Sequence, residues 1–201
     1  PIGNMRDITL RALDVLQAAD LIACEDTRVF AKLATHYGIS APTVSYSDAT
    51  QDKSEPRLVR ALAAGKSVAL VSDAGMPLIS DPGYRLVRAA VEAGHPVTSA
   101  PGPSAVPMAL ALSGLPTDRF FFAGFLPARG TERRRAIGEV ASVPSTLVFF
   151  EAPHRLPEAL ADLVELLGDR PAAVARELTK LFEEVRRGSL GKLAAHYAKH
   201  P

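Results

Sequence analysis

Two carboxylates lie in one loop rich in glycine and proline, directly after a short apolar run. Asp73 follows the run Ser67–Val71, and Asp81 lies further along the loop, just before an amphipathic segment. In open α/β sheets, ligands bind beyond the carboxyl ends of the strands, so a loop in this position is a candidate binding site. We interpret Asp73, at the end of the apolar run, as a functional residue. Asp81 is instead predicted to cap the helix that follows.

Five further short motifs combine polar residues with glycine, proline or aromatic residues. They are Pro1–Asn4, Cys24–Arg28, Ala100–Ala105, Phe149–Arg155 and Arg176–Lys180. Ser104 resembles the nucleophile of a Gly-x-Ser-x-Gly elbow, but the second glycine is absent, which disfavours a hydrolase. Backbone contacts from Ser104 and Ala105 to a ligand, or an N-cap at Ser104, both fit the motif. Gly3 permits a close approach of its backbone to another group.

Metal and nucleotide motifs are not found in the sequence. The five histidines show no paired spacing with a nearby carboxylate, and no Cys-x-x-Cys pair exists. Neither a P-loop nor a Gly-x-Gly-x-x-Gly fingerprint is present. The single cysteine, Cys24, cannot form an internal disulfide, so we expect a buried thiol and a reducing cytoplasmic compartment. No metal is expected.

The charge is almost balanced over the 201 residues: 23 Lys and Arg against 22 Asp and Glu give a net charge of +1. A balanced chain has no overall field that would hold nucleic acid, so contact with nucleic acid requires a local patch. The one basic patch is Arg129–Arg135, which either meets phosphates or forms a solvated helix face. No stretch approaches the ~20 apolar residues of a membrane-spanning helix.

Apolar periodicity and glycine stops predict alternating strands and helices. This alternation is typical of an α/β fold with mostly parallel sheets. The break Gly114–Asp118 predicts two α/β domains, residues 1–115 and 116–201. The expected strands are Leu21–Cys24, Thr43–Tyr46, Ser67–Val71, Pro96–Ser99, Arg119–Ala123, Thr146–Phe150 and Ala173–Arg176. The expected helices are Asp7–Ala19, Arg28–Tyr37, Glu55–Ala64, Tyr84–Ala93, Ala105–Leu112, Glu132–Val140, Pro157–Leu167 and a last helix from the cap Ser189 to His200.

The six motifs, in this order from Pro1 to about Ser189, resemble one family closely. They are similar to those of the bacterial small-subunit ribosomal RNA methyltransferases in the tetrapyrrole methylase superfamily. The resemblance implies two α/β domains with a cofactor cleft between them, and S-adenosylmethionine as the methyl donor. It implies 2′-O-methylation of a cytidine in small-subunit rRNA by a homodimer. Because 201 residues are too few to enclose a structured RNA, we expect the acceptor to be an assembled small ribosomal subunit.

The resemblance also assigns roles to individual residues. Methyl transfer from a sulfonium requires alignment of donor and acceptor and little covalent chemistry, which suits loops without a nucleophile. A base or a positive neighbour would assist the ribose hydroxyl, and Glu25, Asp26, Glu177 and Lys180 remain open candidates. The expected cofactor contacts are Ile2, Gly3, Ser72, Asp73, Ala74, Gly75, Met76, Ser104, Ala105, Phe149, Phe150 and Glu177. The expected RNA contacts are Arg28, Arg133, Arg134, Arg135, His154 and Arg155.

The chain departs from the family pattern in a few places. The family usually has an apolar strand before the Pro-Ile-Gly-Asn motif and a further strand after the last helix, so we expect a chain that is truncated at both ends. Met76 stands where Thr is frequent, and Ala152 where Ser is frequent. Another methyltransferase of the superfamily, acting on a tetrapyrrole or a protein, and a non-catalytic RNA-binding module are the alternatives.

Overall fold

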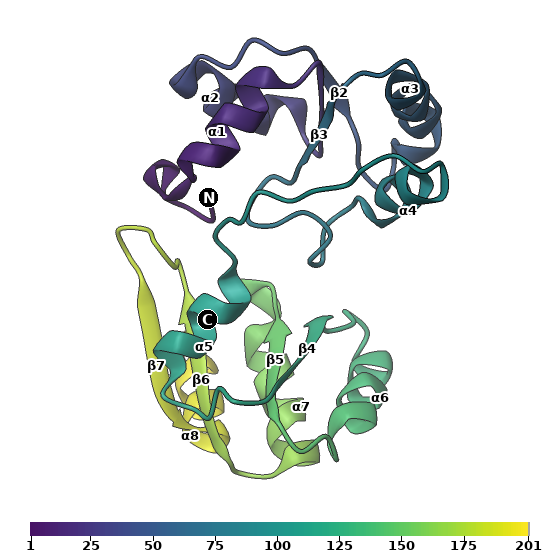
Figure 1. Cartoon of the computed structure of the whole chain (residues 1–201). Coiled ribbons are helices and arrows are strands. Elements are labelled where there is room, and N and C mark those ends of the chain that lie inside the picture. Colours follow the sequence, from purple (N-terminus) through teal and green to yellow (C-terminus); the bar gives the residue numbers. More distant parts are fainter. Residues whose placement is uncertain (201) are drawn as a thin grey trace. The chain divides into compact units, whose positions relative to one another are not determined.

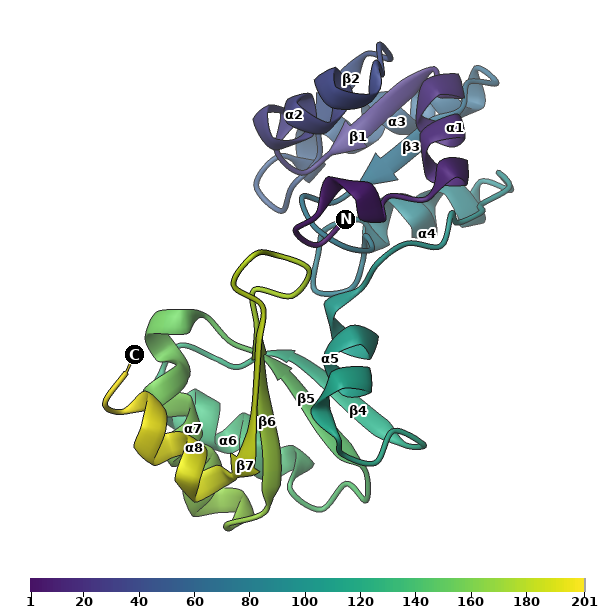
Figure 2. The same ribbon diagram turned by 90° about the vertical axis from the view of Figure 1, so that its left-hand side faces the viewer.

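The computed structural model describes residues 1–200 and divides the chain into two compact units, Pro1–Ser104 and a second that begins at Ala105. Figure 1 and Figure 2 show the elements of each unit from two sides. The boundary precedes the predicted break at Gly114–Asp118. The reason is that helix α5 (Ala105–Ser113) contacts strands β6 (Pro171–Arg176) and β7 (Glu184–Ser189) of the second unit. The Arg187 guanidinium on β7 also donates two hydrogen bonds to the carbonyl of Leu112 on α5.

The first unit contains a three-stranded parallel sheet in the order β2-β1-β3. Its strands are β2 (Thr43–Ser45), β1 (Leu21–Cys24) and β3 (Val68–Val71). The central strand β1 is buried along its whole length, as its unbroken apolar run predicts. Cys24 is in register with both Ser45 and Val71, so the three strands end together at one edge of the sheet.

Helices cover both faces of this sheet because the side chains of β1 alternate between two cores. Ile22 and Cys24 pack with Leu16 of α1 (Leu10–Ala18) and with Phe30 of α2 (Thr27–Tyr37). Ala23 packs on the other face, with Leu58 of α3 (Gln51–Ala63) and Leu86 of α4 (Tyr84–Glu92). Figure 1 shows α1 and α2 together on one side of the sheet and α3 and α4 on the other.

Three expectations for the first unit are wrong. Asp7 does not cap α1: it ends a 3₁₀ turn, Met5–Asp7, and the hydroxyl of Thr9 accepts from the backbone N–H of Ala12 instead. The third helix begins at Gln51, four residues before the expected start at Glu55, so that Pro56 lies inside it. Residues 96–99 form no strand, because the backbone there pairs with no strand of the described chain.

The second unit has two separate two-stranded ladders. Strands β4 (Phe120–Phe125) and β5 (Thr146–Phe150) are parallel, whereas β6 and β7 form an antiparallel hairpin. The sequence did not predict β7, since Glu184–Ser189 carries charges instead of an apolar run. Helices α6 (Gly130–Val140), α7 (Leu156–Leu167) and α8 (Leu190–Tyr197) complete the unit, with a 3₁₀ turn at Pro153–Arg155. The predicted cap of α8 is confirmed: the Ser189 side chain accepts from the N–H of Lys192.

A core of eight buried residues joins the helices of the second unit to its strands. Ile137 of α6, Leu160 of α7 and Leu193 of α8 lie in this core. Phe149 of β5 and Val174 of β6 pack against it from the strands. No helix in residues 1–200 is long and apolar enough to span a membrane.

Candidate functional site

Three of the sequence motifs contact one another in the first unit: Pro1–Asn4, the loop after β3 and Ala100–Ala105. The N–H of Gly75 donates to the carbonyl of Pro1 over 3.0 Å. A Cβ on Gly75 would lie 3.5 Å from Cγ2 of Ile2 and 3.7 Å from the carbonyl oxygen of Pro103. The φ of +87° at Gly75 is one that L side chains rarely adopt, so glycine is favoured there for its conformation as well as for space.

A fourth motif, Cys24–Arg28, is joined to the loop after β3 by two hydrogen bonds at the ends of β1 and β3. The Asp73 carboxylate accepts from the backbone N–H of Asp26 over 3.0 Å. The N–H of Asp73 in turn donates to the Glu25 carboxylate over 3.4 Å. The parallel register of β1 and β3 brings these loops to the same edge of the sheet. The structure thus places four motifs beyond the carboxyl ends of parallel strands, where a ligand site is expected.

The backbone of the loop after β3 is strained. Leu78 and Ser80 have φ values of +71° and +61°, a region that costs non-glycine residues about 1–3 kcal/mol each. Gly83, with φ +136°, leaves no room for a side chain, since a Cβ would lie 2.5 Å from Leu70 Cδ2. Such strain persists only where the surrounding structure fixes the loop, and it clusters at binding sites.

Asp81 does not cap α4, in contrast to the prediction. The N-cap position is Gly83, and no side chain accepts a hydrogen bond there. Burial is the main cause that raises the pKa of Asp81 to about 6, and the nearby carboxylates of Glu25 and Asp73 raise it further. A carboxyl group with this pKa can exchange a proton near neutral pH. Sequence reasoning missed this role because only the folded loop brings Asp81 close to Glu25.

The Asp26 carboxylate is already hydrogen-bonded to Arg28. Its side chain accepts from the backbone N–H of Arg28 at 2.8 Å, as the N-cap of α2, and from the Arg28 guanidinium at 2.6 Å. These bonds lower the pKa of Asp26 to about 2. A carboxylate with so low a pKa is a weak proton acceptor, so Asp26 is poorly suited as the base.

Cys24 is buried, as predicted. Burial raises the pKa of its thiol to about 11, and the carboxylates of Asp73 and Asp26 add to this effect. The thiolate that would be needed for nucleophilic chemistry is therefore scarce at neutral pH. Within residues 1–200, no group of three or more His, Cys, Asp or Glu side chains is arranged to hold a metal ion.

The candidate residues at the end of β5 and directly after it have different surroundings. Phe149 packs against the core of the second unit, whereas Phe150 lies edge-on to Phe122 with ring centroids 4.8 Å apart. The Arg155 side chain forms an ion pair with Glu151, with Nη2 2.6 Å from Oε1, and is only 23% exposed. This ion pair makes Arg155 a poor candidate for RNA contact, and only His154 of the two is exposed.

Glu177 and Lys180 lie together in the loop between β6 and β7. The Lys180 ammonium is 3.0 Å from the Glu177 carboxylate, and both side chains are about half exposed. Glu177 and Thr179 have φ values of +51° and +68°. Every left-handed non-glycine residue within residues 1–200 therefore lies in one of two motif loops, the one after β3 or this one.

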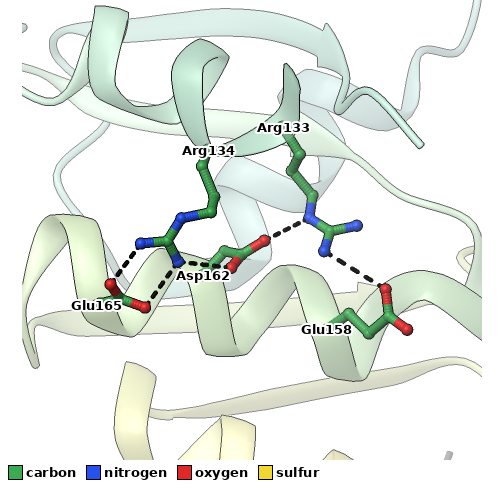
Figure 3. A network of polar contacts seen from close by, with 5 residues as sticks. All are labelled: Arg133, Arg134, Glu158, Asp162 and Glu165. Carbon is green, nitrogen blue, oxygen red and sulfur yellow. Dashed lines mark hydrogen bonds and ion pairs between the residues drawn. The ribbon is translucent and has the colours of Figure 1, made fainter. Parts of the chain in front are cut away.

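Two of the three arginines of the predicted RNA patch on α6 are paired with carboxylates of α7. The Arg133 side chain is 6% exposed and donates from Nε to Asp162 over 2.6 Å. Arg134 bonds both Asp162 and Glu165 of α7, and Figure 3 shows the resulting network, which also includes Glu158. These side chains face α7 because Asp162, Glu158 and Glu165 form an acidic stripe at helical spacing. Arg135 remains exposed, with only a loose 3.6 Å contact to Glu139.

The remaining candidates lie at the junction of the two units or on the first one. Ser104 is the last residue of the first unit, and Ala105 begins α5; both are partly buried. A Cβ on Gly102 would lie 3.3 Å from the sulfur of Met76, so this part of the loop also packs against the loop after β3. Gly3, Ala74 and the partly buried Ser72 belong to the same group of loops, and the Ser72 hydroxyl donates to the carbonyl of Gly75 over 3.3 Å.

The chain is similar to known methyltransferases over nearly its whole length. Residues 1–194 match the family model of tetrapyrrole (corrin/porphyrin) methylases. A ribosomal RNA small subunit methyltransferase I from Mesorhizobium japonicum is 55% identical over 98% of this chain and 68% of its own length. The protein of the same name from Micromonospora olivasterospora is 52% identical over 97% of this chain, which spans only 62% of that relative.

A solved structure has the same fold. The uroporphyrin-III C-methyltransferase of Thermus thermophilus, in complex with S-adenyl homocysteine, aligns with a TM-score of 0.63 at 21% identity, over 97% of this chain and 87% of that one. The chain therefore belongs to the tetrapyrrole methylase family, and within it to the ribosomal RNA small subunit methyltransferase I proteins.

Proposed function

We propose that the chain transfers a methyl group from S-adenosylmethionine to the 2′-hydroxyl of a cytidine in small-subunit ribosomal RNA. The main support is the identity of 46–55% to relatives that all carry the name of this RNA methyltransferase. The motif loops that converge beyond β1 and β3 support a binding site with shaped backbone and no nucleophile. A tetrapyrrole or a protein acceptor is the alternative that the broader family offers.

The loops around Gly75 fit the donor in shape and in charge. Gly75 and Gly102 let the backbone approach a ligand closely. Three acidic residues, Glu25, Asp73 and Asp81, lie near one another here, and their negative field suits a ligand that carries a sulfonium and an ammonium group. We assign the donor contacts to Ile2, Gly3, Ser72–Met76, Ser104 and Ala105, with Phe149, Phe150 and Glu177 from the second unit.

S-adenosylmethionine supplies an electrophilic methyl group, so the protein must align the acceptor, exclude water and accept one proton. The sequence suggests four residues as proton acceptors. The low pKa of Asp26 makes it a weak acceptor, which leaves Glu25, Glu177 and Lys180. We add Asp81 to these candidates, because burial raises its pKa to about 6 and a base with that pKa can accept a proton near neutral pH. Ribose hydroxyls are weak acids, and a lysine ammonium near the oxygen also lowers the cost of its deprotonation.

For the RNA we retain Arg28, Arg135 and His154 as contacts, since these side chains are exposed. Their role is to fix the phosphate backbone and so to position the target ribose. The acceptor is proposed to be an assembled small ribosomal subunit, and the active form a homodimer in the cytoplasm.

The test is transfer of a labelled methyl group to small ribosomal subunits from cells that lack this gene. We expect label in small-subunit RNA, on a cytidine ribose, and none in subunits that already carry the modification. Transfer to a porphyrin-like compound or to a protein, with none to RNA, would overturn the proposal.

A further inference from the structure

The loop Leu178–Glu183, which connects β6 and β7, presents two large apolar side chains to solvent. Leu181 and Phe182 are 89% and 76% exposed. Figure 2 shows this loop as the protruding tip of the long β6–β7 hairpin. Exposed aromatic residues are more frequent at binding surfaces than elsewhere on a protein, and neither Leu181 nor Phe182 has a role in the site described above.

The tip is held in one conformation. Leu178 is buried and anchors its beginning. The Glu183 carboxylate accepts from the N–H of Thr179 over 2.7 Å, and the N–H of Glu183 donates to the carbonyl of Lys180 over 3.2 Å. Thr179 has a left-handed backbone, with φ +68°. These bonds restrain the backbone that carries Phe182, which lowers the entropy cost of binding through the loop.

The size of the tip indicates what it binds. An aromatic side chain buries about 150–250 Å², whereas a stable protein interface needs about 800 Å² from each partner. Two side chains on a narrow hairpin are therefore too small for a stable protein interface. They match the face of one unstacked base, the usual partner of exposed aromatic residues in RNA recognition. The Lys180 ammonium, directly before Leu181, lies beside the tip and pairs with the half-exposed Glu177 carboxylate at 3.0 Å, so an adjoining phosphate would compete with that carboxylate for it.

We propose that Phe182 stacks on an unpaired base of the substrate RNA and so positions the strand that carries the methylated ribose. This inference rests on the proposed function, because it requires an RNA substrate. Phe182 is a positioning residue: it contacts a base of the substrate and takes no part in proton or methyl transfer. Base–aromatic stacking contributes about 1–3 kcal/mol per base.

Two substitutions separate stacking from general apolar contact. Phe182→Leu keeps an apolar side chain without a ring, and Phe182→Trp keeps a flat aromatic face. With unmethylated small ribosomal subunits as substrate, we expect Phe182→Leu to raise KM by about 5- to 150-fold, the range that corresponds to one stacked base. Phe182→Trp should keep a near-normal KM, and neither variant should change the affinity for S-adenosylhomocysteine.

The Phe182→Trp variant also reports binding directly, because the chain contains no other tryptophan. Stacking on a base should quench its fluorescence when small ribosomal subunits are added. The control is Leu10→Trp, on α1 of the first unit, where the native side chain is 81% exposed; its fluorescence should change little.

Several outcomes would overturn the inference. One is an unchanged KM for Phe182→Leu while the wild type methylates RNA normally; this removes the stacking role and leaves the proposed function intact. Another is a fluorescence change that follows protein concentration without RNA, which would assign the tip to contact with a second copy of the chain. A wild type that neither binds nor methylates the subunits removes the proposed function together with this inference.

Discussion

Arg133 of α6 donates from its guanidinium Nε to the carboxylate of Asp162 on α7 over 2.6 Å, with both side chains largely buried. The sequence around Arg133 suggests an RNA-binding patch, but in the structure this arginine joins two helices. The pKa of Asp162 is lowered by its hydrogen bonds to Arg133 and Arg134, which outweigh the cost of burial.

Replacement of Arg133 by serine is therefore expected to destabilise the fold instead of weakening RNA contact alone. Removal of one partner from a buried ion pair leaves the other charge unpaired and costs about 3–5 kcal/mol. Urea unfolding monitored by circular dichroism measures the loss. Arg135→Ser is the matched control, since this side chain is 77% exposed and should change the free energy of unfolding by less than about 0.5 kcal/mol. Equal stability of the two variants would contradict the structural role.

Gly83→Ala is expected to cost more than an ordinary change of glycine to alanine. The left-handed backbone alone costs about 1–2 kcal/mol, and a Cβ 2.5 Å from Leu70 Cδ2 adds overpacking of about 1–3 kcal/mol. Gly94→Ala is the control, because Gly94 also has a positive φ but nothing lies within 4 Å of a Cβ there. Thermal unfolding of both variants compares them, and a larger loss for Gly94→Ala would refute the packing argument.

Asp73→Ala is expected to weaken cofactor binding while the protein stays folded. The change removes the acceptor for the N–H of Asp26 and one charge of the carboxylate group beyond β1 and β3. Because this charge-assisted hydrogen bond orders the loop that we propose as a cofactor contact, we expect its loss to raise the Kd about tenfold. Calorimetry with S-adenosylhomocysteine measures it, with Asp14→Ala on the exposed face of α1 as the control. An unchanged Kd for Asp73→Ala would remove Asp73 from the site.

Asp81 should make the protein less stable as the pH rises from about 4 to about 6. Its pKa is raised to about 6 in the folded chain, so the folded state holds a proton that the unfolded state releases near pH 4. The stabilisation is present below about pH 4 and is lost by the time the pH has risen past 6. Asp81→Asn removes this term and should stabilise the protein at pH 7 by about 1 kcal/mol, since solvent screens much of the shift.

The measurement for Asp81 is the difference in unfolding free energy between Asp81→Asn and the wild type at pH 4 and at pH 7. We expect the two proteins to differ more at pH 7 than at pH 4. A difference that is independent of pH would show that the carboxyl group of Asp81 has an ordinary pKa.

The same variant tests whether Asp81 is the proton acceptor of the reaction. Loss of kcat with unchanged KM would support Asp81, whereas a normal kcat would leave Glu25, Glu177 and Lys180 as the candidates.

The sequence determined the α/β class and most of the elements, because local signals carry that information. Apolar runs marked β1, β3 and β5, and Gly38 ended α2 with φ +67° as its position predicted. The motif after β3 could be recognised as a candidate site because parallel strands place their carboxyl ends at one edge. The family membership followed from the order of six such motifs.

Contacts between distant segments were decided only by the tertiary structure. Arg133 and Asp162 are 29 residues apart, and no local pattern shows that one buries against the other. The charged strand β7 forms because the antiparallel partner β6 satisfies its backbone, and the segment 96–99 remains irregular for lack of such a partner. The pKa of Asp81 likewise depends on burial and on carboxylates that the fold brings near. Hydrogen bonding and electrostatics act through space, whereas sequence patterns report only on neighbours along the chain.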